Sequence, residues 1–543
     1  MNILGLSVAT TEHHAAALVQ NGRLVAAAEE ERFNRIKHYG AFPRGPLSNA
    51  NLLNDASLTL RDVLCKQAIR WVLTVSQLTE NEIDIIAING VPAKYRSGSL
   101  QNADPQSFVP VRDGRYLFVP HHLCHAASAY RLSGFSEARV LTVDGRGERE
   151  TAACFDATAT GILTRRHEVA VRDRHSFGGL YETTSRMLGM GAFGQGTVMA
   201  LAALGKPGFS LNDSVWARSF DDVNLDVVAL QQLLMNVART ESEPLLEIHR
   251  DVAYAVQHAL EEAILVLGTQ TMTKGAGMPL CLAGGVALNC PTNTRLFRQL
   301  QPAGMFVQPA AHDAGTAIGA ALEAAFQLGE PRPERMQHAA WGPTIDAEEC
   351  AAALTRHGLA LHLPNDPAGE VAQRLADGAI VCRAVGRMEI GPRALGQRSI
   401  LADPRRAELK DRLNYMKSRA SWRPFGPSIL AGRESEWFED AFVSPFMLFT
   451  QNVLPPRRSE IPVVVHADGS TRPQSVERHI LPDYAAILDA FNDLTGVPMV
   501  VNTSFNRGGE PIVCTPEDAV VSFLGLGADC LQLGPFFVDR TRR

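Results

Sequence analysis

The fold is decided at the N-terminus, where residues 1–29 run MNILGLSVATTEHHAAALVQNGRLVAAAE. Three apolar segments stand out here, at residues 1–8, 15–19 and 24–29, and each has the length of a strand. The dipeptide Asn21-Gly22 between the last two is a strong β-hairpin signal, because both residues tolerate the positive φ angles of a tight turn. The stretch therefore predicts three strands joined by turns.

The same arrangement returns in the middle of the chain, at residues 139–144, 151–157 and 161–169. A turn of sequence Ala-Thr-Ala-Thr separates the last two segments. Two copies of a strand–turn–strand–turn–strand unit predict a duplicated α/β fold with a cleft between its halves, as in the actin-like phosphotransferases. The alternative is that short strands recur by chance.

Helical and strand patterns alternate around and after the second copy. Residues 251–268 carry apolar side chains at helical spacing, and residues 278–282 and 305–308 have the pattern of short strands. Residues 316–326 form an Ala/Gly-rich segment that suits a helix packed closely on a sheet. The Gly315-to-Gly319 spacing at its start predicts tight helix packing and not a membrane dimer.

A chain of 543 residues is too long for one hydrophobic core. The Gly- and Pro-rich residues 329–333 have the composition of a linker. We therefore predict an N-terminal domain over residues 1–340 and a C-terminal domain over residues 341–543. Near its end, the second domain has a strand at residues 499–502 that enters a polar loop.

Composition narrows the class of protein. An apolar fraction of 45% and a charged fraction of 20% are those of a soluble globular protein. A net charge of −6 disfavours general nucleic-acid binding, and no apolar run reaches the length of a membrane span. The start lacks a signal-peptide pattern, and the nine scattered cysteines form no CxxC pair. We expect a cytoplasmic protein with reduced thiols, no nucleic-acid or membrane partner, and a monomeric or homodimeric state.

One stretch of the second domain is strongly basic. Residues 382–425 contain eleven lysines and arginines against four acids, namely Arg383, Arg387, Arg393, Arg398, Arg405, Arg406, Lys410, Arg412, Lys417, Arg419 and Arg423 against Glu389, Asp403, Glu408 and Asp411. Such an excess repels itself unless an anion lies among the cations, and guanidinium groups bind phosphate oxygens in pairs. A solvated helix face is the alternative, but Pro392 and Pro424 interrupt any helix here. The stretch predicts a site for a phosphorylated small molecule.

Other residues form candidate sites by their spacing. His121 and His125 share one face if their segment is helical, and Asp144 and Asp313 each end a predicted strand or loop, so the four could bind Fe²⁺, Mn²⁺ or Zn²⁺. Ordinary capping residues are the alternative.

Two further groups of residues are candidates for nucleotide binding. The glycines Gly178-Gly179, Gly194, Gly196 and Gly284-Gly285 would allow a nucleotide to approach the backbone closely, or they serve turns. Lys417 and Arg419, with Ser504 and Asn506, could hold a triphosphate and a small carboxylate-like group, or belong to unrelated loops.

The chain resembles the antibiotic and nodulation O-carbamoyltransferases over nearly its whole length. The blocks that carry this resemblance are HHLCHAASAY, LAGGVALN, HDAGTAIGAAL, MEIGPRALGQRSILADP, KSRASWRPFGP, HADGSTRPQSV, TGVPMVVNTSFNRGGEPIV and TPEDAV. The resemblance implies that residues 1–340 form a metal-dependent carbamoyl-transfer domain of actin-like fold. It implies that residues 341–543 form an α+β YrdC-like domain that makes carbamoyl adenylate from carbamoyl phosphate and ATP.

The activity implied is transfer of the carbamoyl group to a hydroxyl of a secondary metabolite. An iron-type divalent metal would be held by His121, His125, Asp144 and Asp313. ATP, with Mg²⁺, and carbamoyl phosphate would be co-substrates. The matching positions in the second domain are Arg387 or Arg393, Lys417, Arg419, Arg423, Arg472, Asn502, Ser504 and Asn506, and in the first domain the nucleotide candidates are Gly179, Gly284, Gly285 and Asn289.

Catalytic roles follow from the same chemistry. Lys417 and Arg419 would stabilise the charge that moves among phosphates during adenylation. Relatives show His-Asp before small residues, whereas this chain has Glu12-His13-His14, so His13 or His14 is the expected base for the acceptor hydroxyl. Gln195 and Thr197 stand where relatives tend to carry an acid and a lysine.

Three rival functions are weighed against carbamoyl transfer. A threonylcarbamoyl transferase for tRNA is disfavoured by the net charge of −6. An actin-like sugar or acid kinase would leave residues 382–425 without a role. A nucleotide-dependent scaffold is disfavoured because both histidines, both aspartates and Lys417 are present. The acceptor is open, since the low aromatic content gives no sugar-stacking stripe.

Overall fold

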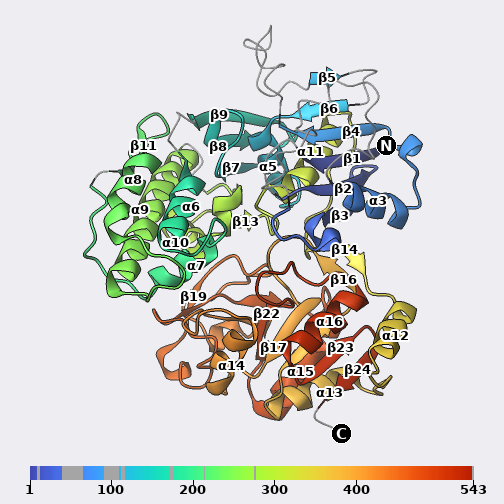
Figure 1. Ribbon diagram of the computed structural model, residues 1–543. Coiled ribbons are helices and arrows are strands. Elements are labelled where there is room, and N and C mark those ends of the chain that lie inside the picture. Colours follow the sequence, from blue (N-terminus) through green and yellow to red (C-terminus); the bar gives the residue numbers. More distant parts are fainter. Residues whose placement is uncertain are drawn as a thin grey trace. The chain divides into compact units, whose positions relative to one another are not determined.

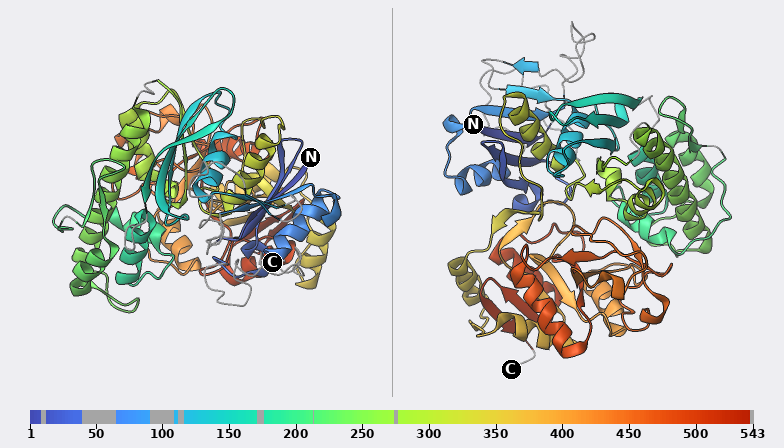
Figure 2. Two further views of the ribbon diagram at one scale, coloured as in Figure 1. Left: turned by 90° about the horizontal axis from the view of Figure 1, so that it is seen from above. Right: turned by 180° about the vertical axis from the view of Figure 1, so that it is seen from behind.

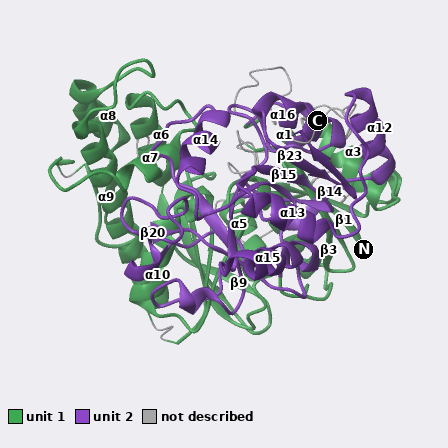
Figure 3. Ribbon diagram, turned by 90° about the horizontal axis from the view of Figure 1, so that it is seen from below, with its two compact units in different colours: residues 1–31, 38–336 green, residues 32–37, 337–543 purple. Residues whose placement is uncertain are grey.

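The computed structural model, drawn in Figure 1 and from two further sides in Figure 2, describes most of the chain. The described residues are 1–8, 13–39, 65–90, 109–111, 116–170, 176–212, 214–273 and 277–540. They divide into two compact units, shown in Figure 3. Unit 1 contains residues 1–31 and 38–336, and unit 2 contains residues 32–37 and 337–543.

The first sheet of unit 1 begins with the predicted three strands. These are β1 (Asn2–Ser7), β2 (Ala15–Gln20) and β3 (Arg23–Glu29), all antiparallel, and Asn21 and Gly22 turn the hairpin with φ angles of 49° and 75°. On its other side β1 pairs in parallel with β4, and the sheet order is β3-β2-β1-β4-β6-β5. The added strands are β4 (Ile85–Asn89), β5 (Val109–Val111) and β6 (Tyr116–Val119).

The second sheet of unit 1 repeats this plan. Three antiparallel strands, β7 (Ala138–Val143), β8 (Glu150–Ala157) and β9 (Leu163–Ala170), are followed across the sheet by strands parallel to β7. Those are β12 (Leu280–Ala283) and β13 (Met305–Val307), in the order β13-β12-β7-β8-β9. The repeat confirms the predicted duplicated α/β fold.

Two buried helices pack between these sheets. Helix α11 (Ala314–Gln327) lies on β1, β2 and β4, and helix α5 (His121–Tyr130) lies on β7 and β12. The helices pack on each other so closely that a Cβ on Gly319 would lie 1.8 Å from the Cys124 carbonyl oxygen. The predicted tight packing around Gly315 and Gly319 is confirmed, and it fixes the start of α11 beside the start of α5.

The remaining helices of unit 1 gather at one side, in green in Figures 1 and 2. They are α6 (Phe177–Met187), α7 (Gln195–Ala202), α8 (Val227–Leu234), α9 (Glu247–Met272) and α10 (Cys290–Leu300), with a short ribbon of β10 (Val215–Ala217) and β11 (Val223–Leu225). Helix α3 (Lys66–Val75) covers β2 and β3. Among the described residues, no helix combines the length and apolar character that crossing a membrane requires.

Unit 2 is built on one mixed sheet of seven strands in the order β21-β18-β22-β17-β15-β23-β24. The strands are β15 (Val381–Ala384), β17 (Arg398–Ala402), β18 (Gly426–Leu430), β21 (Gln474–Val476), β22 (Met499–Ser504), β23 (Cys530–Leu533) and β24 (Phe536–Asp539). Its helices are α12 (Ala347–Arg356), α13 (Pro367–Ala376), α14 (Glu408–Met416), α15 (Pro482–Thr495) and α16 (Pro516–Leu526). Two ribbons, β14 (Ala340–Thr344) with β16 (Arg387–Glu389) and β19 (Gln451–Asn452) with β20 (Ser470–Thr471), complete an α+β unit.

The division differs in two respects from the predicted ranges 1–340 and 341–543, the first being that unit 1 ends at residue 336 and not at 340. Residues 32–37, which contain most of the short helix α1 (Glu31–Asn34), belong to unit 2. Arg35 donates to the carbonyl oxygens of Ile512 and Pro511 at 2.7 and 2.9 Å, and Arg32 donates to that of Gly391 at 3.0 Å. These partners are hundreds of residues away in sequence, so no local pattern could assign the segment.

Candidate metal centre and candidate anion site

Four side chains from three elements converge in unit 1. His121 and His125 lie one turn apart at the start of α5, Asp144 directly follows β7, and Asp313 directly precedes α11. The helix begins where it does because Pro120 stands at its N-cap, with φ of −52°. We call these four the metal-site residues, and their ligand atoms all lie within 4.8 Å of one another.

The distances among the metal-site residues fit a single ion. The two Nε2 atoms are 3.0 Å apart, His121 Nε2 lies 3.2 and 3.7 Å from Asp144 Oδ2 and Asp313 Oδ1, and His125 Nε2 lies 3.8 and 3.6 Å from the same oxygens. Four ligands bound at about 2.1 Å in a tetrahedron lie about 3.4 Å from one another. Two imidazoles and two carboxylates are a donor set for Fe²⁺, Mn²⁺ or Zn²⁺.

The charges of the metal-site residues also favour a cation. Burial opposes charge on His121, but the carboxylates of Asp313 and Asp144 outweigh it and raise the pKa of His121 to about 9. Burial likewise opposes charge on Asp144, but His121 and His125 hold the pKa of its carboxyl well below the usual range. A metal bound by these residues would displace the proton on His121.

Neighbouring groups position the metal-site residues. Asp144 Oδ1 accepts the Gly285 N–H at 2.7 Å, which turns Oδ2 toward the histidines. Gly284 has φ of 92°, and a Cβ there would lie 2.2 Å from the Val143 carbonyl oxygen. Both glycines, predicted as nucleotide contacts, thus have a local role in placing Asp144.

Two further nucleotide candidates of unit 1 also have local partners. Asn289 caps α10 by accepting the Thr292 N–H, and its amide donates to Tyr181 and Gln257. The Gly179 N–H donates to the Ser176 side chain at the start of α6. Both residues therefore have a structural role at the start of a helix, and nucleotide binding by them stays a prediction.

The two candidate bases lie in different surroundings. His14 is buried at the start of β2, and its ring meets Tyr39 edge-on with centroids 5.8 Å apart. His13 has φ of 58°, an uncommon backbone conformation. Its ring stacks on that of His312, the residue directly before Asp313, with ring centroids 4.4 Å apart. Its Nδ1 atom is buried and makes no hydrogen bond within the described ranges. His13 is therefore the candidate that borders the metal-site residues.

Two glutamates surround His13. In one group, His13, Glu29 and His312 have ligand atoms within 4.8 Å of one another, and in another His13, Glu31 and His38 do. Glu29 and Glu31 are buried, and Glu31 accepts the His38 backbone N–H at 2.6 Å. Sequence reasoning missed these neighbours, although Glu29 ends the third predicted strand and Glu31 follows two residues later.

The candidate anion site of unit 2 is smaller than the basic stretch. Arg383 and Arg398 are buried against backbone carbonyls, Arg387 donates to the Trp341 and Gly342 carbonyls, and Arg405 pairs with Asp403. Four further cations lie near one another and form no ion pair with an acid among the described residues, and we call them the basic group: Lys417, Arg419, Arg423 and Arg472.

Burial makes the basic group costly without an anion. Burial first, then Arg419 and Lys37, lower the pKa of Lys417 well below its usual range. Burial and the neighbours Arg423 and Arg472 lower the pKa of Arg419 to about 8. Buried like charges raise the free energy of the folded protein unless an anion joins them. Lys37, which comes from the segment 32–37, was not predicted.

Strand β22 and the loop after it hold Lys417 in place. Its Nζ donates to the carbonyl oxygens of Ser504 and Asn506 at 2.5 and 2.9 Å, and Ser504 Oγ donates to Asn506 Oδ1 at 2.6 Å. Asn502 instead donates to Ala394, Ser428 and Gln474. The structure thus joins Lys417, Ser504 and Asn506, and places Asn502 in an adjoining network. The Nε of Arg393 is buried, and ligand binding by Arg393 stays a prediction.

Two family descriptions match the two parts of this chain. The family described as Carbamoyltransferase N-terminus matches residues 110–322, and that described as Carbamoyltransferase C-terminus matches residues 372–540. Nodulation protein NolNO of Sinorhizobium fredii is 36% identical over 97% of this chain and 78% of its own. Nodulation protein NolO of Bradyrhizobium diazoefficiens is 40% identical over 77% of this chain and 78% of its own.

A relative without an assigned role matches at similar strength. An uncharacterized protein of Synechocystis is 34% identical over 99% of this chain and 97% of its own. The two family matches cover most of the chain, and they include the metal-site residues and the basic group. The chain is therefore an enzyme of the carbamoyltransferase family, and it contains both the N-terminal and the C-terminal part of that family.

Proposed function

We propose that the protein is an O-carbamoyltransferase that works in two steps at two sites. In unit 2, a YrdC-like domain on this proposal, carbamoyl phosphate, ATP and water give carbamoyl adenylate, phosphate and pyrophosphate. In unit 1, a hydroxyl of a secondary metabolite takes the carbamoyl group and AMP leaves. The observation that carries the proposal is that one chain contains two complementary clusters. The ligand atoms of the metal-site residues suit a divalent cation, and the buried cations of the basic group suit a phosphate.

The basic group supplies what the first step requires. Adenylation forms a bond from carbamate to the α-phosphorus of ATP and breaks the bond to pyrophosphate, so negative charge moves onto the leaving group. Lys417 is fixed by carbonyls of β22 and its loop, and Arg419 is held by Asn414 Oδ1 at 2.6 Å and lies over the Phe425 ring at 4.1 Å. Fixed cations of this kind stabilise a moving charge without reorganising.

The metal-site residues suit the second step. Bound by His121, His125, Asp144 and Asp313, an iron-type divalent ion would act as a Lewis acid on the carbamoyl oxygen. The acceptor oxygen attacks the carbamoyl carbon, its proton moves to a base, and the bond to AMP breaks.

His13 is our choice for that base. It borders the metal-site residues through His312, whereas His14 packs against Tyr39 on the side of α3. A carboxylate that accepts the single N–H of the neutral imidazole leaves the other ring nitrogen free to act as the base, and Glu29 and Glu31 lie close enough to accept it. The test is His13→Asn beside His14→Asn. We expect transfer to be lost in the first and retained in the second.

The overall proposal is tested by product analysis. The protein is incubated with ATP, carbamoyl phosphate and Fe²⁺ under anaerobic conditions, and pyrophosphate, ADP and AMP are quantified. We expect pyrophosphate to form only when carbamoyl phosphate is present. Release of ADP without pyrophosphate would instead make the protein a kinase.

A further inference from the structure

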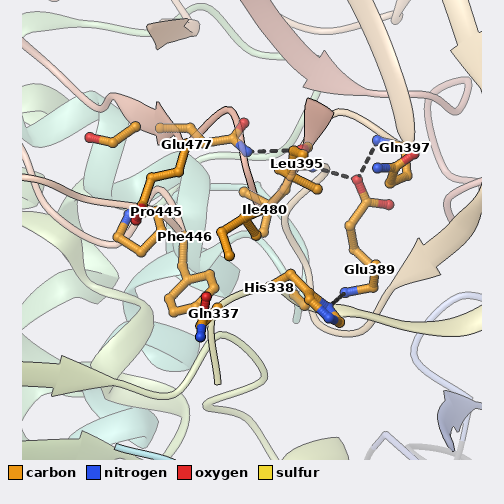
Figure 4. Close-up of a pocket in the computed structure, with 14 residues that line it drawn as sticks. Gln337, His338, Glu389, Leu395, Gln397, Pro445, Phe446, Glu477 and Ile480 are labelled. Carbon is orange, nitrogen blue, oxygen red and sulfur yellow. Dashed lines mark hydrogen bonds between the residues drawn. The ribbon is translucent and has the colours of Figure 1, made fainter. Parts of the chain in front are cut away.

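A cavity in unit 2 is surrounded by buried polar side chains but is too small for an organic ligand. Its lining includes His338, Glu389 and Phe446, and it has room for about one or two water molecules (Figure 4). Glu389 Oε1 accepts the backbone N–H groups of Leu395 and Gln397 at 2.7 and 2.8 Å (Figure 4). Water is a sufficient occupant for this cavity.

A group of three side chains in unit 1 has instead the composition of a metal site. It consists of His13, Glu31 and His38, whose ligand atoms all lie within 4.8 Å of one another. We call these three the second-site residues, and none of them belongs to the metal-site residues. Two ligand atoms bound to one ion at about 2.1 Å lie at most about 4.2 Å apart. Small side-chain rotations would therefore bring all three onto a single ion.

Local contacts hold the second-site residues together. The chain leaves unit 1 after Glu31 and returns to it at His38, and Glu31 accepts the His38 backbone N–H at 2.6 Å. Phe193 stacks on the His38 ring with centroids 4.0 Å apart, and His13 meets the same ring edge-on at 5.2 Å. Both histidines have positive φ, 58° at His13 and 57° at His38. Such conformations are uncommon outside glycine and cluster at functional sites.

The ring of His13 has a nitrogen that lacks a partner. Its Nδ1 atom is buried and makes no hydrogen bond within the described ranges. A buried polar atom without a hydrogen bond raises the free energy of the folded protein, and an imidazole nitrogen binds metal ions readily. The surroundings of His13 therefore favour a bound ion.

A rival set around His13 is less suited to a metal. It joins His13 to Glu29 and His312. His312 Nδ1 accepts the Ala314 N–H at 3.2 Å, so the neutral ring carries its proton on Nε2. Neither ring nitrogen of His312 then offers a lone pair to an ion. The hydrogen bonds therefore favour Glu31 and His38 as the partners of His13.

We propose that the second-site residues bind a second divalent transition-metal ion and that this ion inhibits the acceptor step. Two imidazoles and one carboxylate are a donor set for Zn²⁺. A neutral imidazole that binds an ion carries its proton on the other nitrogen, so His13 would have no lone pair left for the proton of the acceptor hydroxyl. The inhibition rests on the proposed function, because it needs His13 as the base, whereas the binding does not.

The number of bound ions tests the site without any activity measurement. The full-length protein is stripped of metal, dialysed against Zn²⁺ and analysed for zinc per chain. We expect two ions in the wild-type protein and one in His38→Asn, which removes an imidazole at a position where Asn tolerates the positive φ. One ion in the wild-type protein, or two in His38→Asn, would overturn the proposal.

Matched variants separate the second-site residues from other ligands. Glu31→Gln keeps an oxygen that can accept the His38 N–H, and it should bind one ion. Glu29→Gln changes the carboxylate of the rival set and should bind two. His258→Asn removes an exposed histidine that lies 3.7 Å from Glu262, and it should also bind two. Loss of the second ion in Glu29→Gln or His258→Asn, with two ions kept in Glu31→Gln, would place the ion elsewhere and contradict the proposal.

Protection of His13 from a chemical reagent tests the inhibitory role directly. Diethyl pyrocarbonate modifies the lone pair of a neutral imidazole, and peptide mass spectrometry reports the rate at each histidine. With Zn²⁺ at ten times its Kd for the second site, modification of His13 should slow about tenfold in the wild-type protein. It should be almost unchanged in Glu31→Gln.

The two readouts keep this inference apart from the proposed function. Neither needs pyrophosphate release or a known acceptor, so both can support the second site even if the proposed reaction is wrong. A wild-type protein that binds two zinc ions but leaves His13 as reactive as before would show that His13 is not a ligand, and the proposal would fall.

Discussion

The metal-site residues and the basic group are both buried clusters of ionisable side chains, but they are assembled in opposite ways. The metal-site residues balance two imidazoles with two carboxylates, at distances that match the edges of one coordination sphere. The basic group brings four cations together with no acid between them among the described residues. The first cluster is completed by a cation and the second by an anion, so perturbing one should leave the other intact.

The largest effect should come from neutralising Lys417. Lys417→Met keeps the length of the side chain but removes the charge, so pyrophosphate formation should fall about 100- to 1,000-fold. Metal content, measured by elemental analysis, should not change. Lys410→Met, on the helix that leads to Lys417, is the control and should keep its activity. Loss of metal together with activity in Lys417→Met would show that the two clusters are not independent.

The next effect concerns metal affinity. Asp144→Asn removes one ligand charge, and we expect Fe²⁺ or Zn²⁺ affinity to fall by about 100-fold or more, as titration with a competing chelator would report. Asp156→Asn on strand β8 removes a carboxylate that pairs with Arg139 and Arg166, and it should bind metal like the wild-type protein. Unchanged affinity in Asp144→Asn would mean that the ion lies elsewhere.

The two clusters should respond to pH with opposite signs. His121 has a pKa raised to about 9, and a metal needs its neutral ring, so metal affinity should rise with pH by up to about tenfold per unit until pH 9. Lys417 has a lowered pKa, and an anion favours its charged form, so phosphate affinity should fall as pH rises. Calorimetry from pH 6 to pH 9 measures both, and parallel trends would refute the contrast.

The smallest effect should come from Asn289→Ala. If Asn289 mainly caps α10, its loss should lower the free energy of unfolding by about 1 kcal/mol, seen as a lower melting temperature, with nucleotide affinity unchanged. A clear loss of nucleotide affinity at unchanged stability would instead assign Asn289 to the nucleotide site.

Local sequence patterns were sufficient for much of unit 1. The hairpin turn at Asn21-Gly22 and the alternation of apolar strands and turns predicted both copies of the three-stranded unit, because these signals act over a few residues. The one-turn spacing of His121 and His125 likewise places them on one face of α5. The approach of Asp144 and Asp313 follows from the duplication, which brings β7 and the start of α11 to the same place.

Long-range contacts account for what the sequence could not predict. The arginines of residues 382–425 appear equivalent in sequence, yet Arg398 is held by carbonyls at Pro343 and Val385, and Arg383 is held by one at Gly396 and by Gln532. Only the fold separates such structural cations from the basic group.

The most direct test of two separable sites is the exchange of labelled pyrophosphate into ATP by the Asp144→Asn variant, with carbamoyl phosphate present. Our account predicts exchange close to the wild-type rate, since unit 2 alone would make and reverse the adenylate. If exchange disappears when this one ligand in unit 1 is changed, while the variant remains folded, a single shared site must perform both steps and the account is wrong.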